Sequence, residues 1–395
     1  MIGKITNKIR NLIMLRFLRR LRTKLPPSAS SIHVETQGSK TDHAPLARFV
    51  GMVAVLGVLY DQTSRMESSV MLGRKDTRAV NVRKRTSKAD TALLVSSSAV
   101  RGDRSTMEDT LFVSPNRRFA AVFDGHGGAD VATYLKEHLY DAIVNALGPK
   151  DTWSIEDIEQ SLRLAFREAD AAILDRREWL TQGSTATAVL LIDDLIWSMN
   201  VGDSRAVLCR NGRALNLTRD HKPNDPIERA RIERCGGRVQ WHGLRDPKGQ
   251  PIPDMGAYRI NANLAVARAF GDSDQRPYVS GEMELKCFRR DPSDKFIVIA
   301  SDGLWDVFTS AEVVTFVKDV LAGEVGGRES WRSGGHAETS VELFEWRQKY
   351  RNDSSMIKAA VSRRKAQMAT YLTQGALYRG TADNVAVAVI WLDKH

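Results

Sequence analysis

Four aspartates adjoin short apolar runs whose pattern predicts buried strands, so each carboxylate is placed at a strand end. Asp124 follows RRFAAVF, and Asp302 follows KFIVIAS. Asp203 follows LIWSMNVG, and Asp383 precedes NVAVAVIWL. A single aspartate of this kind is usually only a turn residue, but several carboxylates at one sheet edge would repel one another unless cations lay among them. Oxygen ligands without a His/Cys cluster favour Mg²⁺ or Mn²⁺ over zinc.

Two neighbouring segments add groups that suit phosphoryl transfer. In RSTMED, Arg104 stands four residues before Glu108, with Asp109 beside it, so an extended chain would put Arg104 and Glu108 on one face. A guanidinium beside metal-bound carboxylates can hold a phosphate through two hydrogen bonds. In DGHGG, His126 follows Asp124 by two residues. A lone histidine is usually structural, but one in a glycine-rich turn beside a metal carboxylate is a good general-acid candidate.

The segments that must position these groups predict an α+β protein from about Thr91 onward. Short β-branched runs alternate with amphipathic stretches of helical period, such as ADVATYLKEHLYDAIVNAL and IEDIEQSLRLAFREADAAIL. Asn211-Gly212 after one run is a hairpin-turn signal. Strands joined by hairpins, with long helices between them, predict antiparallel sheets inside and helices outside.

Charge divides the 395-residue chain into two unlike parts. Residues 1–92 hold 18 Lys and Arg against six Asp and Glu, whereas residues 93–395 hold 40 against 42. The net charge of +10 therefore belongs to the N-terminal part, and the near-neutral body gives no electrostatic argument for nucleic acid. Three scattered cysteines, in no CxxC pair and no Cys-x5-Arg loop, disfavour a disulfide framework, a thiolate zinc site and a thiol-based phosphatase.

We interpret residues 1–92 as a basic N-terminal extension that ends in a linker. The first 25 residues hold eight Lys and Arg and no acid. With their apolar residues at helical spacing they are typical of a mitochondrial transit peptide, an interfacial helix on anionic lipid, or a disordered basic tail. The uncharged run at 49–60 would span about 18 Å as a helix, against about 30 Å of hydrocarbon. We expect mitochondrial or membrane association, with membrane contact through residues 1–60, and a cytoplasmic location as the alternative.

The order of the motifs resembles that of the metal-dependent Ser/Thr protein phosphatases of type 2C. The resemblance covers roughly residues 93–395 and rests on eight ordered segments: RSTMEDT, FAAVFDGHGG, GSTATAVL, NVGDSRAVL, DHKPNDPIERARIERCGGRV, NLAVARAFGD, IVIASDGLWDV and TADNVAVAVI. It implies a four-layer αββα sandwich of two antiparallel sheets flanked by helices, with a binuclear metal site at one end. It further implies a monomeric enzyme that hydrolyses phosphoserine and phosphothreonine in phosphoprotein substrates.

The same resemblance implies ligands for two divalent cations, Mg²⁺ or Mn²⁺. Asp124 matches the carboxylate that bridges the two ions. Asp302 and Asp383 would complete the ligands of one ion. Glu108 and the Gly125 carbonyl would serve the other.

Further residues match the family in supporting roles. Asp109 would act mainly through bound water. Asp203 and Asp306 match acids that can hold a third, weaker ion. Arg104 matches the phosphate-binding arginine, and His126 matches the acid proposed to protonate the leaving alkoxide. A catalytically inactive relative would usually lack one of these groups, so their full presence favours an active enzyme over a binding module.

Three departures from the family pattern stand out. Ala262 and Ala267 replace the usual glycine and serine, which predicts effects on the backbone or on neighbouring side chains. Residues 240–258, in the region that resembles the substrate-side flap, form a longer segment than usual. An insertion at about 321–355 is either a surface loop or a docking element.

Overall fold

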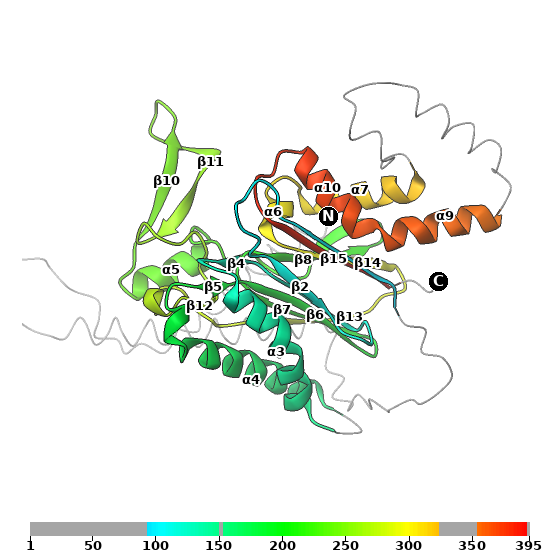
Figure 1. The fold of residues 1–395 in the computed structure, drawn as a ribbon, viewed down its shortest axis with the longest axis horizontal. Coiled ribbons are helices and arrows are strands. Elements are labelled where there is room, and N and C mark those ends of the chain that lie inside the picture. Colours follow the sequence, from blue (N-terminus) through cyan, green and yellow to red (C-terminus); the bar gives the residue numbers. More distant parts are fainter. Residues whose placement is uncertain (1–92, 150–152, 324–353, 393–395) are drawn as a thin grey trace, which may run out of the picture. The chain divides into compact units, whose positions relative to one another are not determined.

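Two five-stranded antiparallel sheets lie face to face in the computed structural model, which describes residues 93–149, 153–323 and 354–392 (Figure 1). The first sheet has the order β2, β3, β6, β7, β13, with bounds Thr110–Val113, Phe119–Phe123, Ala186–Ile192, Leu195–Val201 and Glu284–Arg289. The second has the order β1, β15, β14, β8, β9, with bounds Val95–Val100, Val385–Trp391, Asp294–Ala300, Arg205–Arg210 and Arg213–Asn216.

Both faces of each sheet are buried, which explains the continuous apolar runs in the sequence. Successive residues of a strand point to opposite faces. In β3, Phe119, Ala121 and Phe123 belong to the core under the first helical layer. Ala120 and Val122 belong to the core between the two sheets.

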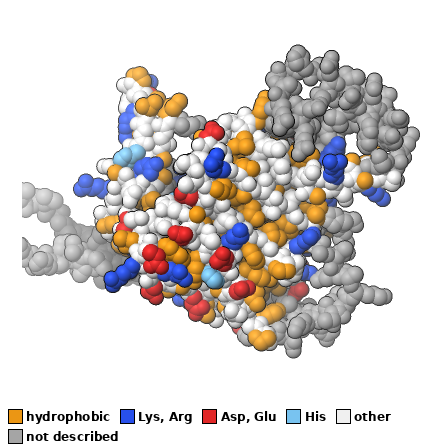
Figure 2. Space-filling model, viewed as in Figure 1, with side chains coloured by type: hydrophobic (Ala, Val, Ile, Leu, Met, Phe, Trp, Pro, Cys, Tyr) orange, Lys and Arg blue, Asp and Glu red, His pale blue; other side chains and the backbone are white. Residues whose placement is uncertain are grey.

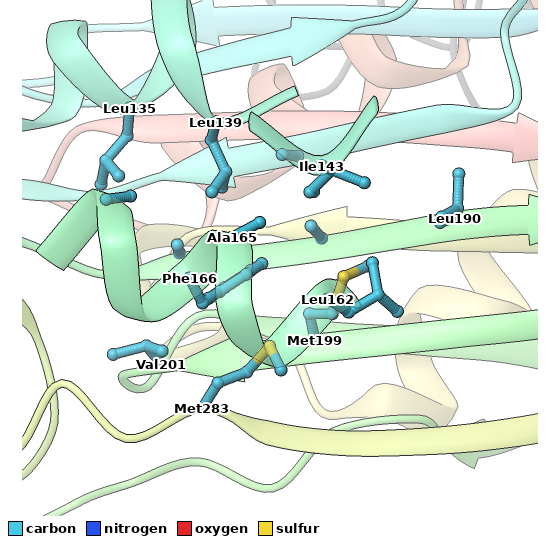
Figure 3. Packing of buried hydrophobic residues seen from close by; sticks show 14 of the residues in the cluster. Leu135, Leu139, Ile143, Leu162, Ala165, Phe166, Leu190, Met199, Val201 and Met283 are labelled. Atoms are coloured by element: carbon cyan, nitrogen blue, oxygen red, sulfur yellow. The ribbon is translucent and has the colours of Figure 1, made fainter. Parts of the chain in front are cut away.

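Helices α3 (Asp130–Leu147) and α4 (Ile155–Leu174) pack on the outer face of the first sheet. A capping box begins α4, because the Ser154 hydroxyl accepts from the Asp157 N–H while the Asp157 carboxylate accepts from the Ser154 N–H. Figure 3 shows side chains that these helices and the sheet bring together, among them Leu135, Leu139, Ile143, Leu162, Phe166 and Met199.

The outer face of the second sheet is covered by α6 (Asp302–Trp305), α7 (Ser310–Ala322), α9 (Ser354–Ala366) and α10 (Met368–Tyr378). Thr309 and Glu312 form a second capping box, at the start of α7. Helices therefore lie outside both sheets, and the predicted four-layer αββα sandwich is confirmed.

Two smaller units complete the described chain. A three-stranded sheet has the order β12, β5, β4, with bounds Phe270–Gly271, Gly183–Ser184 and Gly125–His126. Short 3₁₀ turns lie at Arg177–Trp179 and Ser273–Gln275. The other unit, here called the flap, consists of α5 (Pro226–Arg234) and the hairpin of β10 (Val239–Arg245) and β11 (Pro251–Ile260), with its own apolar core. Figure 1 shows the hairpin extending away from α5, and the hairpin contains the segment 240–258.

The basic extension at 1–92 and most of the insertion at about 321–355 lie outside the described residues. Within the described ranges, no helix has both the length and the apolar character needed to cross a membrane. On the face drawn in Figure 2, cationic and anionic side chains are interspersed over the described surface, in keeping with the near-neutral charge of residues 93–395.

Candidate metal centre

Strand pairing brings the predicted acids of the first sheet together. Asp109 directly precedes β2 and Asp124 directly follows β3. Because Thr110 pairs with Phe123 across these antiparallel strands, the two aspartates extend from neighbouring strand ends.

The second sheet places its acids at the same edge. Asp302 follows β14 and begins α6, and Asp383 stands two residues before β15. The Ser301 N–H donates to the Ala386 carbonyl at 3.0 Å, which joins these two strand ends. The Asp109 carboxylate interacts with both Ser301 and the Ala386 backbone, so it bridges from the first sheet to the second.

Burial without matching positive charge dominates the electrostatics of these carboxylates. Burial raises the pKa of Asp109 to about 7, despite its hydrogen bonds with Ser301 and Asp124. Burial, and then the charges of Asp109 and Asp302, raise the pKa of Asp124 well above its usual range. Burial, and then the charges of Asp203 and Asp306, do the same to the pKa of Asp302. Added cations would relieve this repulsion.

Two cations of the chain lie among the acids. Arg104 donates to Asp383 at 2.7 Å, and its side chain is 61% exposed. The Lys222 ammonium lies 3.7 Å from Asp203 and 3.6 Å from Asp306. Lys222 belongs to the segment DHKPNDP, but no pattern in the sequence predicted this contact.

The donor chemistry of the centre fits a divalent cation. Its side chains offer hard oxygen atoms, and Asp109 Oδ2 is buried without a hydrogen-bond partner. Across the residues that the structure describes, no three His, Cys, Asp or Glu side chains already converge into a ligand group. The carboxylates thus lie near one another at one edge of the sandwich without forming a closed ligand group.

The loop before β2 differs from its sequence-based expectation. Residues 101–109 are not extended as a strand, so Arg104 and Glu108 do not share a strand face. Asn384 holds this loop instead. Its side chain accepts from the Glu108 N–H at 2.7 Å and donates to the carbonyls of Arg101 at 2.7 Å and Thr106 at 3.0 Å. Asn384, which sequence reasoning missed, therefore fixes the loop that carries Arg104 beside Asp383.

Gly125 is required where this loop approaches the strand end. A Cβ atom at position 125 would lie 2.7 Å from the Glu108 carbonyl oxygen, so a larger residue would push the two segments apart. This contact places the Gly125 backbone next to Glu108, the pair that the resemblance assigned to one ion.

His126 lies in β4 beside the acids, and its side chain is 24% exposed. Its Nε2 atom is 2.8 Å from both carboxylate oxygens of Asp272. Burial by itself would lower the pKa of His126, but the hydrogen bond and charge of Asp272 outweigh it and raise that pKa. Asp272 was not predicted, although it ends the quoted segment NLAVARAFGD.

Ala262 shows what the departure from glycine does to the backbone. Its φ is 64°, in the left-handed region that glycine adopts without steric cost. A residue with a Cβ atom is strained in this conformation, so the predicted effect on the backbone has a physical basis here.

The sequence as a whole matches a known family. A family model described as Protein phosphatase 2C matches residues 93–385, which is more than half of the chain. The chain therefore belongs to the protein phosphatase 2C family, a family of Ser/Thr protein phosphatases, and the resemblance noted from its motifs is confirmed.

Individual relatives carry the name of the same family. The chain is similar to "Probable protein phosphatase 2C 71" of Arabidopsis thaliana, with 41% identity over 201 residues that span 50% of this chain and 41% of that protein. It is also similar to "Probable protein phosphatase 2C 69" of the same plant, with 34% identity over 279 residues, 68% of this chain and 74% of that one. The chain thus spans less than half the length of the first relative.

A solved structure supports the fold. The serine-threonine phosphatase 2C from Toxoplasma gondii superimposes with a TM-score of 0.50 and 22% identity, covering 77% of this chain and 96% of that chain. At this level of identity the likeness bears on the architecture alone.

Proposed function

We propose that the chain is a metal-dependent phosphatase that hydrolyses phosphoserine and phosphothreonine in proteins at a binuclear Mg²⁺ or Mn²⁺ centre. The observation that carries this proposal is the group of Asp109, Asp124 and Asp302 at one edge of the sandwich, where burial first and neighbouring carboxylates second raise the pKa of each. Structural carboxylates are normally paired when buried, whereas ligands of a dication need unpaired charge.

The residues that would hold the two ions are Asp124, Asp302, Asp383, Glu108 and the carbonyl of Gly125, with Asp109 acting through water. Two such ions, when bound, supply a water of lowered pKa and neutralise the charge of a phosphate. Asp203 and Asp306 are the proposed holders of a third ion, at the position where Lys222 now lies between them.

Arg104 is the proposed phosphate-binding group. Its guanidinium is mostly exposed, stands at the rim of the acid cluster and has planar geometry suited to two phosphate oxygens. Asn384 keeps its loop in place through three hydrogen bonds. Arg104 can therefore hold a phosphoester near the acids without rebuilding the loop.

His126 is the proposed general acid. A Ser or Thr alkoxide is a strongly basic leaving group, so a proton supplied as the phosphorus–oxygen bond breaks lowers the barrier. The raised pKa of His126 keeps the ring protonated over more of the neutral range. The structure gives this ring a carboxylate partner on one side and partial exposure on the other.

For residues 1–92 we propose a targeting role, in mitochondria or at a membrane. The net charge of +12 and the amphipathic start of these residues support it. Fractionation of tagged full-length and 91–395 chains tests the proposal. Loss of organelle or membrane association on truncation is the expected result, and a soluble cytosolic location for both chains would overturn it.

A metal-stripped assay tests the catalytic proposal. Full-length protein treated with EDTA should not hydrolyse a phosphothreonine peptide, and added Mg²⁺ or Mn²⁺ should restore hydrolysis. Full activity in the chelated sample would refute the metal dependence. Binding of the peptide without turnover at any metal concentration would instead identify an inactive binding module.

A further inference from the structure

We propose that Asp272 is a positioning residue that holds His126 with Nε2 inward and Nδ1 toward the leaving group. This inference rests on the proposed function of His126 as the general acid. Asp272 is 1% exposed, and both of its carboxylate oxygens lie 2.8 Å from His126 Nε2. A carboxylate in this position accepts the Nε2 proton and so sets both the ring's orientation and its tautomer.

The small sheet explains how two residues 146 positions apart meet. Gly183 of β5 pairs with His126 on one side and with Gly271 on the other. The imidazole and the Asp272 carboxylate therefore reach toward each other across Gly183. A Cβ atom there would lie 2.3 Å from Asp272 Oδ2 and 2.5 Å from His126 Nε2. Only glycine leaves room for the pair.

The loop that carries Asp272 is itself fixed. Asp272 adopts a left-handed backbone, with φ 48° and ψ 48°, and its N–H donates to the Gln182 carbonyl at 2.9 Å. Asp170 accepts from the Gly271 N–H at 3.1 Å, and its ion pair with Arg276 at 2.8 Å closes the loop from the far side. Asp272 is thus presented to His126 by a braced segment.

The arrangement defines how the proton moves. The doubly protonated ring gives its Nδ1 proton to the departing oxygen as the phosphorus–oxygen bond breaks, and the bonding pair stays on that oxygen. The ring becomes neutral with its remaining proton on Nε2, still hydrogen-bonded to Asp272. Within the described part of the chain Nδ1 has no hydrogen-bond partner, so it is available to the substrate.

A spectroscopic test addresses the pair without reference to catalysis. Full-length protein carrying ¹⁵N-histidine, free of metal and at a pH where the ring is neutral, should show the Nε2-protonated tautomer for His126, assigned by its loss in His126→Gln. Asp272→Asn should change that tautomer balance, because its amide can donate to Nε2. Asp274→Asn, two residues along the same loop, should not. An unchanged His126 signal in Asp272→Asn would overturn the proposal.

A kinetic test separates positioning from a general structural role. In the metal-loaded enzyme, Asp272→Asn should lower kcat on a phosphothreonine peptide by roughly 10- to 100-fold, a part of the ~10²- to 10⁴-fold contribution of general-acid catalysis, and should leave KM nearly unchanged. Hydrolysis of p-nitrophenyl phosphate, whose leaving group needs no proton, should fall by less than about threefold. Equal losses on both substrates would contradict the role.

Two further variants sharpen the result. In a His126→Gln background, Asp272→Asn should lower peptide turnover no further, because the carboxylate acts only through the ring. An additional loss would refute action through His126. Gly183→Ala should reproduce the substrate-selective loss of Asp272→Asn. If no variant or wild-type sample hydrolyses any phosphoester, the proposed function fails, while the tautomer measurement still decides whether the pair exists.

Discussion

Two regions of the molecule bury carboxylates in opposite ways. In the flap, Glu228 is fully buried and contacts Arg268 at 2.6 Å, Arg231 at 3.0 Å and Arg219 at 3.2 Å. Burial alone would raise the pKa of Glu228, but the hydrogen bond and charge of Arg268, with those of Arg231, lower it. At the metal centre, Asp109 is buried and Asp124 and Asp302 are half-buried, with little positive charge beside them, and the pKa of each is raised.

The contrast separates a structural ion cluster from a ligand site. A carboxylate that the chain neutralises itself adds a fixed crosslink, here between α5 and the segment that carries Arg268. Carboxylates without enough positive charge beside them destabilise the metal-free protein. A bound dication is expected to stabilise them. A lowered carboxylate pKa with several cations nearby marks the structural ion cluster, and a raised pKa with few cations nearby marks the ligand site.

The largest expected effect is on catalysis. Asp124→Asn keeps the shape of the side chain but removes the charge that would bridge two ions. Peptide hydrolysis should therefore fall by roughly 10³-fold, the upper end of the ~10²- to 10³-fold contribution of a single electrostatic group. Asp302→Asn and Asp383→Asn should act in the same direction. Circular dichroism should show an intact fold. Near-normal turnover of any variant at limiting metal would show that its residue is not a ligand.

Replacing the buried carboxylate of the flap should lower stability and leave metal binding unchanged. Glu228→Gln leaves three arginines without their shared counter-ion, and should lower the free energy of unfolding by about 2–3 kcal/mol, somewhat less than for a fully enclosed pair because the arginines keep some contact with water. Urea unfolding measures the change. Because Glu228 is not part of the metal centre, the affinity for Mn²⁺ should stay the same. Reduced metal affinity with unchanged stability would reverse the assignment of the two regions.

The pH dependence of the metal-free protein should separate the two regions again. The pKa of Asp109 is raised from 3.8 to about 7, so its contribution favours folding below pH 4 and is lost as the pH rises towards 7. Asp109→Asn should therefore gain stability relative to wild type across this interval, by up to ~4 kcal/mol at neutral pH, since each pKa unit corresponds to about 1.4 kcal/mol. Urea unfolding in EDTA at several pH values measures it. A constant difference at all pH values would show that Asp109 does not titrate with folding.

The lowered pKa of Glu228 has the opposite sign. Its contribution is present above the ordinary glutamate pKa and is lost as the pH falls through the depressed value. Glu228→Gln should therefore lose its effect on stability in acid, where Asp109→Asn also approaches wild type.

The smallest expected effect concerns the backbone of the turn that follows β11. Ala262→Gly removes a left-handed strain of about 1–2 kcal/mol but adds flexibility to the unfolded chain, so the net gain should be about 0.5–1 kcal/mol. A thermal melt of the two proteins side by side detects this difference. Destabilisation by the glycine would mean that the φ of 64° carries no strain.

Much of this site could be predicted because the ends of buried strands can be recognised in the sequence. Continuous apolar runs placed Asp124, Asp302 and Asp383 at sheet edges, and the structure brings them to one edge. The family resemblance supplied the αββα order of layers, which periodicity alone left as sheets inside and helices outside.

The residues that were missed depend on where loops meet. Asp272 reaches His126 only because β4, β5 and β12 pair around Gly183. Lys222 lies near Asp203 and Asp306 because the Gly202 and His221 backbones are hydrogen-bonded at 3.0 Å. Asn384 donates a hydrogen bond to the carbonyl of Thr106, 278 residues earlier in the chain. No local pattern encodes such contacts.

Calorimetric titration measures whether the under-neutralised acids hold two divalent cations. Mn²⁺ is titrated into EDTA-stripped full-length protein, with Asp124→Asn and Glu228→Gln as matched variants that each remove one carboxylate. We expect two tightly bound ions for wild type and for Glu228→Gln, and loss of both in Asp124→Asn. Absence of binding to wild type, or equal binding to wild type and Asp124→Asn, would contradict it.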